Sequence, residues 1–147
     1  MDILTNFAEN LNDLLIEYGI NAKSFAVSLG MGEATITRYV NKGRVPTVKY
    51  LVKIADYFNC STDYLLGLED EIYPKTFLPC PPFADRLAYL LKYFNRSAYY
   101  LYHDRDITQS KYYNWKNGVS SPSLENVIKL AQIFDCSVDF VIGRSKG

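Results

Sequence analysis

The 147-residue sequence is poor in the residues that build metal centres and most hydrolytic active sites. Its only histidine, His103, has no serine or cysteine nucleophile placed for it by any motif. Asp104 and Asp106 follow it, but no further metal ligand comes at a helical or hairpin spacing. No glycine loop of the kind that cradles phosphate occurs. We therefore expect no catalytic residues, no metal site, no cofactor and no enzyme activity.

Long apolar runs and signal-peptide features are also missing. No stretch reaches 18 apolar residues, so we expect no membrane span. Residues 1–6 lack the basic start and the apolar core of a signal peptide. Cys60 and Cys136 stand beside apolar residues and are expected to be small buried core residues, whereas Cys80 lies alone among prolines. These features predict a protein of the reducing cytoplasm.

The sequence has no net charge, because 16 Lys and Arg residues balance 16 Asp and Glu residues. The balance hides an uneven distribution. Residues 1–67 carry six basic and seven acidic side chains, residues 68–82 carry one and three, and residues 83–147 carry nine and six. The C-terminal part is therefore mildly basic. The global charge neither supports nor excludes a nucleic-acid partner, since a basic footprint can be local.

What the sequence does contain is an internal duplication. Residues 7–67 align without a gap to residues 83–143, 76 positions later, with 15 identities in 61 positions. Self-similarity of this kind indicates two copies of one structural unit, and about sixty residues are enough for each copy to fold by itself. The apolar spacing Phe7, Leu11, Leu14, Leu15 and Tyr18 of the first copy falls on Phe83, Leu87, Leu90, Leu91 and Phe94 of the second.

Each unit is expected to form five short helices and no strand. The apolar spacing just given marks one face of the first helix, and a second, shorter helix is expected near residues 22–29 and 98–105. The last two helices of each unit are predicted from their N-caps, which are Thr47 and Ser61 in the first unit and Ser123 and Ser137 in the second.

The third helix of each unit follows a tight turn. It is expected to start near Glu33, after the turn glycine Gly30 and the N-cap Gly32, and at Gln109, after the N-cap Thr108. Gly43 and Gly118 are expected to end these helices, and the prolines that follow stop any continuation.

Helical spacing sorts the third helices into two faces. Ile36 and Tyr39 in the first unit, and Tyr112 and Trp115 in the second, lie three residues apart and are expected to pack on the core. The remaining residues are mostly polar and are expected to point outward; they are Glu33, Ala34, Thr35, Arg38 and Asn41, and Gln109, Ser110, Lys111, Asn114 and Asn117.

A short helix, a tight turn and a helix with one polar face is the arrangement of a helix-turn-helix. On these residues the chain resembles the λ-repressor/Cro-like, or XRE, helix-turn-helix family. The resemblance covers nearly the whole chain apart from the linker and termini, and it implies an all-α fold of two tandem five-helix DNA-binding domains. The segments that carry it are 24–32, 34–39, 43, 46 and 54–67 in the first unit, and 107–118, 122 and 130–143 in the second.

Some positions depart from the family pattern. Many relatives place a phosphate-contacting Gln in the first turn of the second helix, where this chain has Ala22 and Ala98. The small residue of the second helix, kept as Ala26, becomes Tyr102 in the second unit. The turn glycine, Gly30, becomes Asp106, which tolerates a left-handed turn less well.

The outward residues have the chemistry needed to read a DNA groove. Gln and Asn side chains can contact adenine bidentately, Arg can contact guanine, Ala and Thr can touch the thymine methyl group, and Glu can accept from cytosine. Lys and Arg side chains hold phosphates, which gives affinity without sequence information. The candidate phosphate contacts are Lys42, Arg44, Lys111 and Lys116. The alternative for all of these residues is that they form an ordinary solvated helix face.

The predicted domains are residues 1–68 and 83–147, joined by a linker over 69–82. The linker contains four prolines and is expected to be extended and stiff. With two recognition helices on one chain, we expect a bacterial or phage-type transcriptional regulator, most simply a repressor, with double-stranded DNA as its partner and no membrane association.

A protein-interaction module, such as an antitoxin, is the alternative left open. The second unit carries seven tyrosines, against five in the first. Tyr99, Tyr100 and Tyr102 cannot all be buried on one short helix, and exposed tyrosine is favoured at protein interfaces. A homodimer or a protein partner held through the Tyr-rich second unit is therefore the competing expectation.

Overall fold

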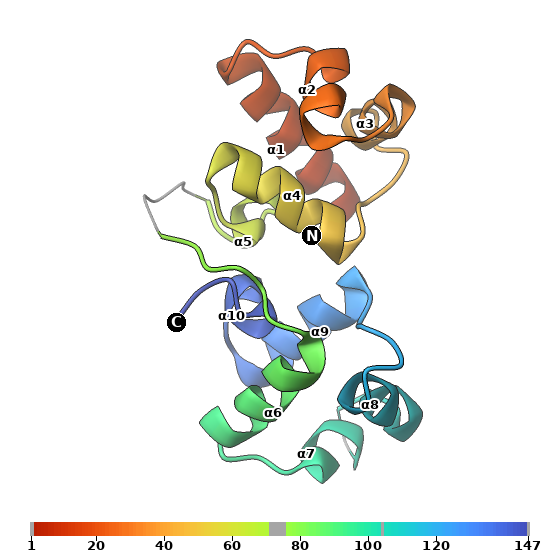
Figure 1. The fold of residues 1–147 in the computed structure, drawn as a ribbon, viewed down its shortest axis with the longest axis vertical. Coiled ribbons are helices and arrows are strands. Elements are labelled where there is room, and N and C mark those ends of the chain that lie inside the picture. The colour runs from red at the N-terminus through yellow and green to blue at the C-terminus, as the bar shows by residue number, and fades with distance from the viewer. Residues whose placement is uncertain (1, 71–75, 104, 147) are drawn as a thin grey trace. The chain divides into compact units, whose positions relative to one another are not determined.

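The computed structural model describes residues 2–70, 76–103 and 105–146 (Figure 1). All regular structure in these ranges is helical, which confirms the expected all-α fold. The chain divides into two compact units, Met1–Lys75 and Thr76–Gly147. None of the helices in the described ranges has the length and apolar character needed to cross a bilayer.

The two units have the same order of helices. The first consists of α1 (Ile3–Glu17), α2 (Ala22–Leu29), α3 (Glu33–Val40), α4 (Val48–Phe58) and α5 (Thr62–Leu65). The second consists of α6 (Phe83–Tyr93), α7 (Ala98–His103), α8 (Gln109–Lys116), α9 (Leu124–Phe134) and α10 (Val138–Ile142). α8 begins and ends 76 residues after α3, and α9 begins and ends 76 residues after α4. This is the spacing of the sequence repeat.

The first helices of the two units differ in length. α1 begins at Ile3, after the N-cap Asp2, whereas α6 begins only at Phe83. Pro79, Pro81 and Pro82 precede α6. Proline has no amide hydrogen for a helical hydrogen bond, so this segment cannot extend α6 toward the N-terminus as residues 3–6 extend α1.

Hydroxyl caps begin the later helices as the sequence predicts. In each case the side-chain oxygen accepts a hydrogen bond from the backbone N–H three residues further on, which satisfies one of the amides left free at a helix start. The capping residues are Thr47, Ser61, Thr108, Ser123 and Ser137. Gly32 is the N-cap of α3 and makes no side-chain cap bond.

The left-handed residues show the duplication most directly. Each unit has five residues with positive φ in the described ranges, and each residue of one set lies 76 positions from its counterpart in the other. The two sets are Gly19, Gly30, Lys42, Asn59 and Gly67, and Asn95, Asp106, Gly118, Asp135 and Gly143. The turns of the two units are therefore equivalent in backbone geometry even where glycine is replaced.

The turns after the two third helices place their glycines differently. Gly118 follows α8 in the left-handed conformation, whereas in the first unit this conformation belongs to Lys42, at φ 62°, and not to Gly43. The N–H of Gly43 instead donates to the carbonyl of Arg38 at 2.8 Å and closes the end of α3. The repeat aligns Gly118 with Lys42 and not with Gly43.

The apolar stripe of the first helix forms the core of each unit, with two corrections. Phe7, Leu11, Leu14 and Leu15 are buried, but Tyr18 is 52% exposed, with its ring against Phe58 at 5.0 Å. In the second unit only the two middle leucines are fully buried, and Phe83, Leu91 and Phe94 are half-buried. Among the cysteines, Cys60 is buried as predicted, whereas Cys136 is only half-buried and Cys80 is exposed.

Equivalent side chains tie the first helix to the last helix in both units. Asn10 Nδ2 donates to the carbonyl of Tyr64 at 2.9 Å, and Arg86 Nε donates to the carbonyl of Phe140 at 2.9 Å. Both donors and both acceptors are 76 residues apart. The last carbonyls of a helix have no partner within it. An amide in the first unit and a guanidinium in the second therefore donate to equivalent carbonyls near the ends of α5 and α10.

The predicted boundaries at residues 68 and 83 stay a prediction. Residues 71–75 of the predicted linker lie outside the described residues.

Candidate nucleic-acid interface

The turn between α2 and α3 is built on two short-range hydrogen bonds. Gly30 has φ 67°, and its N–H donates to the carbonyl of Val27 at 3.2 Å. The N–H of Met31 donates to the carbonyl of Ala26 at 2.9 Å. Ala26 is buried, so α2 presents a small side chain on the side where it packs on α3. The result is a compact helix-turn-helix that fixes the start of α3.

A lysine from the fourth helix reaches this turn in each unit. Lys53 Nζ donates to the carbonyl of Leu29 at 3.4 Å. Its counterpart, Lys129, lies 3.1 Å from the Oδ2 atom of Asp106, the left-handed turn residue of the second unit. Asp106 thus takes the conformation of the glycine it replaces, and its carboxylate faces a lysine amine.

The recognition helix of the first unit, α3, has the two faces that helical spacing predicts. Ile36 and Tyr39 are fully buried, and the ring of Tyr39 packs edge-on against Phe7 at 5.5 Å. Burial raises the pKa of Tyr39 above its usual value, and the nearby charge of Arg44 offsets this in part. Of the predicted outward residues, Thr35 is half-buried, and Glu33, Ala34, Arg38 and Asn41 are exposed.

The recognition helix of the second unit, α8, is divided in the same way. Tyr112 and Trp115 are buried, and the indole of Trp115 packs edge-on against Phe83 at 6.0 Å. Burial also raises the pKa of Tyr112 above its usual value. All the predicted outward residues are exposed; they are Gln109, Ser110, Lys111, Asn114 and Asn117, together with Lys116.

The turns that follow the two recognition helices differ in charge. In the first unit this turn carries Lys42 and Arg44, both exposed, and Lys42 Nζ lies 3.7 Å from the Oε1 atom of Glu9. Both side chains of this ion pair are exposed to solvent, so Lys42 stays accessible to another anion. The equivalent turn of the second unit, residues 118–121, contains no charged side chain.

Tyr113 is an outward residue that the sequence prediction missed. It is 42% exposed and lies three residues after Ser110 and four before Asn117, so it shares their side of α8. Its ring packs edge-on against Tyr112 at 5.1 Å, and Lys116 Nζ lies 5.7 Å from its centroid. The sequence analysis assigned Tyr113 to neither face of the helix, although its spacing from Ser110 and Asn117 could have identified it as outward.

Tyr113 also meets the tyrosine that departs from the family pattern. The pKa of Tyr102 is raised, chiefly by desolvation and also by its interaction with the hydroxyl of Tyr113. The ring of Tyr102 lies 6.0 Å from that of Tyr112. The first unit has Ala26 and Thr37 at the positions of Tyr102 and Tyr113. Two changes between the units therefore come together where α7 packs on α8.

The tyrosines of α7 are accessible, as predicted. Tyr99 is 55% exposed and stacks on His103 with ring centroids 4.4 Å apart, whereas Tyr100 and Tyr102 are half-buried. Two arginines, Arg96 and Arg105, lie 4.6 and 4.1 Å from the centroid of the Tyr100 ring.

No group of three or more His, Cys, Asp or Glu side chains in the described part of the chain is placed to hold a metal ion.

Comparison with known families agrees with this geometry. The helix-turn-helix family model, of the XRE type, matches residues 11–65 and 106–141, which contain the α2-turn-α3 segment of the first unit and α8 of the second. No curated protein and no solved structure matches the chain. The family is one of DNA-binding regulators and is generally non-enzymatic. The chain therefore belongs to the XRE-type helix-turn-helix family and carries its DNA-binding fold twice in tandem.

Proposed function

We propose that this protein is a transcriptional regulator that binds a specific duplex sequence by placing α3 and α8 in the major groove. Occupation of an operator would make it a repressor in the simplest case. The single observation that carries the proposal is the division of both helices into a buried apolar face and an exposed, mostly polar face. A groove-reading helix needs exposed side chains that can donate or accept hydrogen bonds at base edges, and most of the outward residues of α3 and α8 are of these types.

The exposed residues divide into two roles. Most of the outward residues of the two helices reach base edges: Gln109 and Asn114 read adenine, and Arg38 reads guanine. The two lysines of α8 and the two cations that follow α3 hold the phosphate backbone. We assign base contacts to Glu33, Ala34, Thr35, Arg38, Asn41, Gln109, Ser110, Asn114 and Asn117, and phosphate contacts to Lys42, Arg44, Lys111 and Lys116.

Tyr113 adds an apolar contact to the second unit. Its side chain is 42% exposed on the outward side of α8, where an aromatic ring can pack on a thymine methyl group. The first unit has Thr37 at this position, with its hydroxyl bonded to the carbonyl of Glu33 at 3.1 Å. The two units therefore present unlike reading surfaces.

Unlike reading surfaces imply an asymmetric binding site. A single recognition helix reads too few base pairs to be selective, which is why such proteins commonly bind as dimers. Two units on one chain can replace the dimer, since the second binding event becomes intramolecular. We infer that one chain binds two unlike half-sites.

Selection of bound sequences from a random duplex pool by the full chain tests this function. We expect one enriched motif with two unlike halves, and affinity that falls steeply with salt, because neutralised phosphates release counterions. A pool that shows no enrichment, with no binding even at low salt, would exclude the function. A palindromic motif occupied by two chains would exclude the tandem arrangement and leave DNA binding in place.

A second candidate function is binding of another protein through α6 and α7. The specific observation is that Tyr89, Tyr93 and Tyr99 are each about half exposed, with Tyr89 stacked on Tyr93 at 5.8 Å. Tyrosine is enriched at protein interfaces. Absence of DNA binding at low salt together with self-association of the chain would favour this candidate.

A further inference from the structure

Residues 77–81, which we call the strap, pack against the C-terminal end of the second unit. The N–H of Leu78 donates to the carbonyl of Arg144 at 2.9 Å. The ring centroid of Phe77 lies 3.8 Å from Cζ of Arg144. Pro81 Cδ lies 2.6 Å from the position that a Cβ atom on Gly143 would take, so proline and glycine backbone are in close contact. The part of the proline-rich segment that lies directly before α6 is therefore attached to the second unit.

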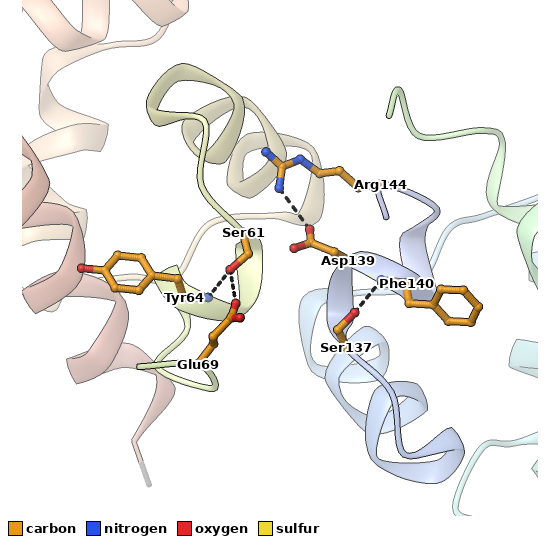
Figure 2. A network of polar contacts seen from close by, with 7 residues as sticks. All are labelled: Ser61, Tyr64, Glu69, Ser137, Asp139, Phe140 and Arg144. Carbon is orange, nitrogen blue, oxygen red and sulfur yellow. Dashed lines mark hydrogen bonds and ion pairs between the residues drawn. The ribbon is translucent and has the colours of Figure 1, made fainter. Parts of the chain in front are cut away.

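The strap explains why one position holds an exposed apolar residue in the first unit and a buried charged residue in the second. Leu68 and Arg144 occupy equivalent positions, and the N–H of each donates to the carbonyl of an aspartate, Asp63 or Asp139, at 2.8 Å. Yet Leu68 is 44% exposed and Arg144 is fully buried. Burial of a guanidinium is costly unless it is paired. Arg144 Nη1 lies 3.1 Å from Asp139 Oδ1 (Figure 2). The face of the Phe77 ring covers the guanidinium of Arg144.

The first unit also extends beyond its last helix. The buried Ser61 is the N-cap of α5, and its hydroxyl oxygen accepts a hydrogen bond from the N–H of Tyr64 (Figure 2). The same hydroxyl donates to Glu69 Oε2 at 2.6 Å. This bond attaches Glu69 to the start of α5. The chain between the two attachment points is residues 70–76, which we call the tether.

The tether is much shorter than the proline-rich segment suggests. Glu69 and Phe77 are eight residues apart, so at full extension the chain separates their Cα atoms by about 29 Å. The 15 residues of 68–82, taken as an extended proline-rich spacer at about 3.1 Å each, would reach about 46 Å. The strap thus removes a large part of the reach.

We propose that the strap restricts the DNA sites of this protein to half-sites about one helical turn apart. The proposal rests on the function proposed above, in which both units bind one duplex. Centres one turn apart are separated by about 34–36 Å, and centres two turns apart by about 68–72 Å. A unit of this size has a radius of gyration of about 11 Å, which for a compact sphere corresponds to an outer radius of about 14 Å. The tether and two outer radii together allow about 57 Å between the centres of the two units, which is enough for one turn and too little for two.

The test compares two duplexes that contain the selected half-sites with one-turn and two-turn spacing. Full-length protein is expected to bind the two-turn duplex at least about tenfold more weakly, because the second unit loses its intramolecular contact. A variant with twelve Gly and Ser residues inserted after Asp70 gains about 40 Å of reach. It is expected to bind both duplexes within about threefold of each other. The same twelve residues added after Gly147 are the control and should leave the tenfold preference unchanged.

Phe77→Ala tests the strap itself. Loss of the ring is expected to release residues 77–81, to remove protection of the Leu78 amide from hydrogen exchange, and to reduce the spacing preference partly. The inserted variant touches none of the contacts described here, so it stays decisive if Phe77→Ala unfolds the second unit.

The failures can be told apart. Equal affinity of the unmodified protein for both spacings, no effect of the insertion, or a full spacing preference in Phe77→Ala with an exchanging Leu78 amide would each overturn the strap proposal alone. If the protein binds both half-site duplexes with no higher affinity than random duplex DNA, the proposed function is wrong as well.

Discussion

Lys129 and Asp106 form a solvent-open ion pair of 3.1 Å across the turn of the second helix-turn-helix, where the first unit has a lysine on a backbone carbonyl. Asp106 is the only member of this pair under backbone constraint, because it stands at φ 64° in place of Gly30. The pair therefore joins a strained turn residue to a stabilising side chain, and the two contributions can be separated by mutation.

Asp106→Gly is expected to leave the free energy of unfolding within about 1 kcal/mol of the parent, because relief of the left-handed strain offsets loss of an exposed ion pair. Asp106→Ala loses the pair without relieving the strain and should lower it by about 1–2 kcal/mol. Urea denaturation of the full chain measures both. Lys129→Ala, which should cost less than about 1 kcal/mol, is the control. An alanine variant as stable as the glycine variant would contradict the assigned strain.

Lys42→Gly should act in opposite directions on folding and on DNA binding. Lys42 is left-handed, so glycine is expected to raise the free energy of unfolding by about 0.5–1 kcal/mol. Loss of the cation should weaken binding to all sequences and lower the slope of log affinity against log salt by about one. Gly118→Ala is the matched reverse change and should destabilise the second unit. An unchanged salt slope in Lys42→Gly would remove Lys42 from the phosphate contacts.

Gln109→Ala and Asn114→Ala should each relax sequence preference at one or two base pairs and cost about 1–3 kcal/mol on the selected site. Binding to random duplex DNA should change little. Lys116→Ala serves as the contrast, because a phosphate contact weakens all sequences alike. If all three variants keep the parent affinity and preference, the second unit does not read DNA.

Tyr39→Phe is expected to be neutral or to stabilise the protein by up to about 1 kcal/mol. The hydroxyl of Tyr39 is buried and has no hydrogen-bond partner among the residues that the structure describes, so its removal relieves a desolvation cost while the ring keeps its contact with Phe7. Thermal unfolding of the two proteins compares them. Tyr39→Leu, which loses the aromatic contact, should be less stable than either. A clear loss of stability in Tyr39→Phe would show that the hydroxyl is satisfied.

A substitution in either recognition helix should reduce the affinity for DNA without changing the number of chains bound per duplex. We expect Arg38→Ala in the first unit and Asn114→Ala in the second to alter opposite halves of the selected motif. One chain per duplex should be bound in each case, as measured by analytical ultracentrifugation or native mass spectrometry. Two chains per duplex, or both variants affecting the same half, would contradict reading by one chain.

Much of the fold was predictable because it depends on short-range chemistry. Hydroxyl caps such as Thr108 and Ser137 mark helix starts by bonds to residues three positions away, and the spacing of Ile36 and Tyr39 places their side chains on one face. The outward residues of α3 and α8 follow from that spacing. The same spacing places Tyr113 on the outward side, but the prediction did not include it.

The sequence by itself determined the duplication, the helices and the family, since periodicity, caps and turn residues act within a few positions along the chain. Only the tertiary structure decided why Arg144 is buried where Leu68 is exposed, and that Phe77 and Leu78 belong to the second unit. Those features depend on contacts between residues far apart in the sequence. Residues 77 and 144 meet through a cation and an aromatic face, and no local pattern records such a contact.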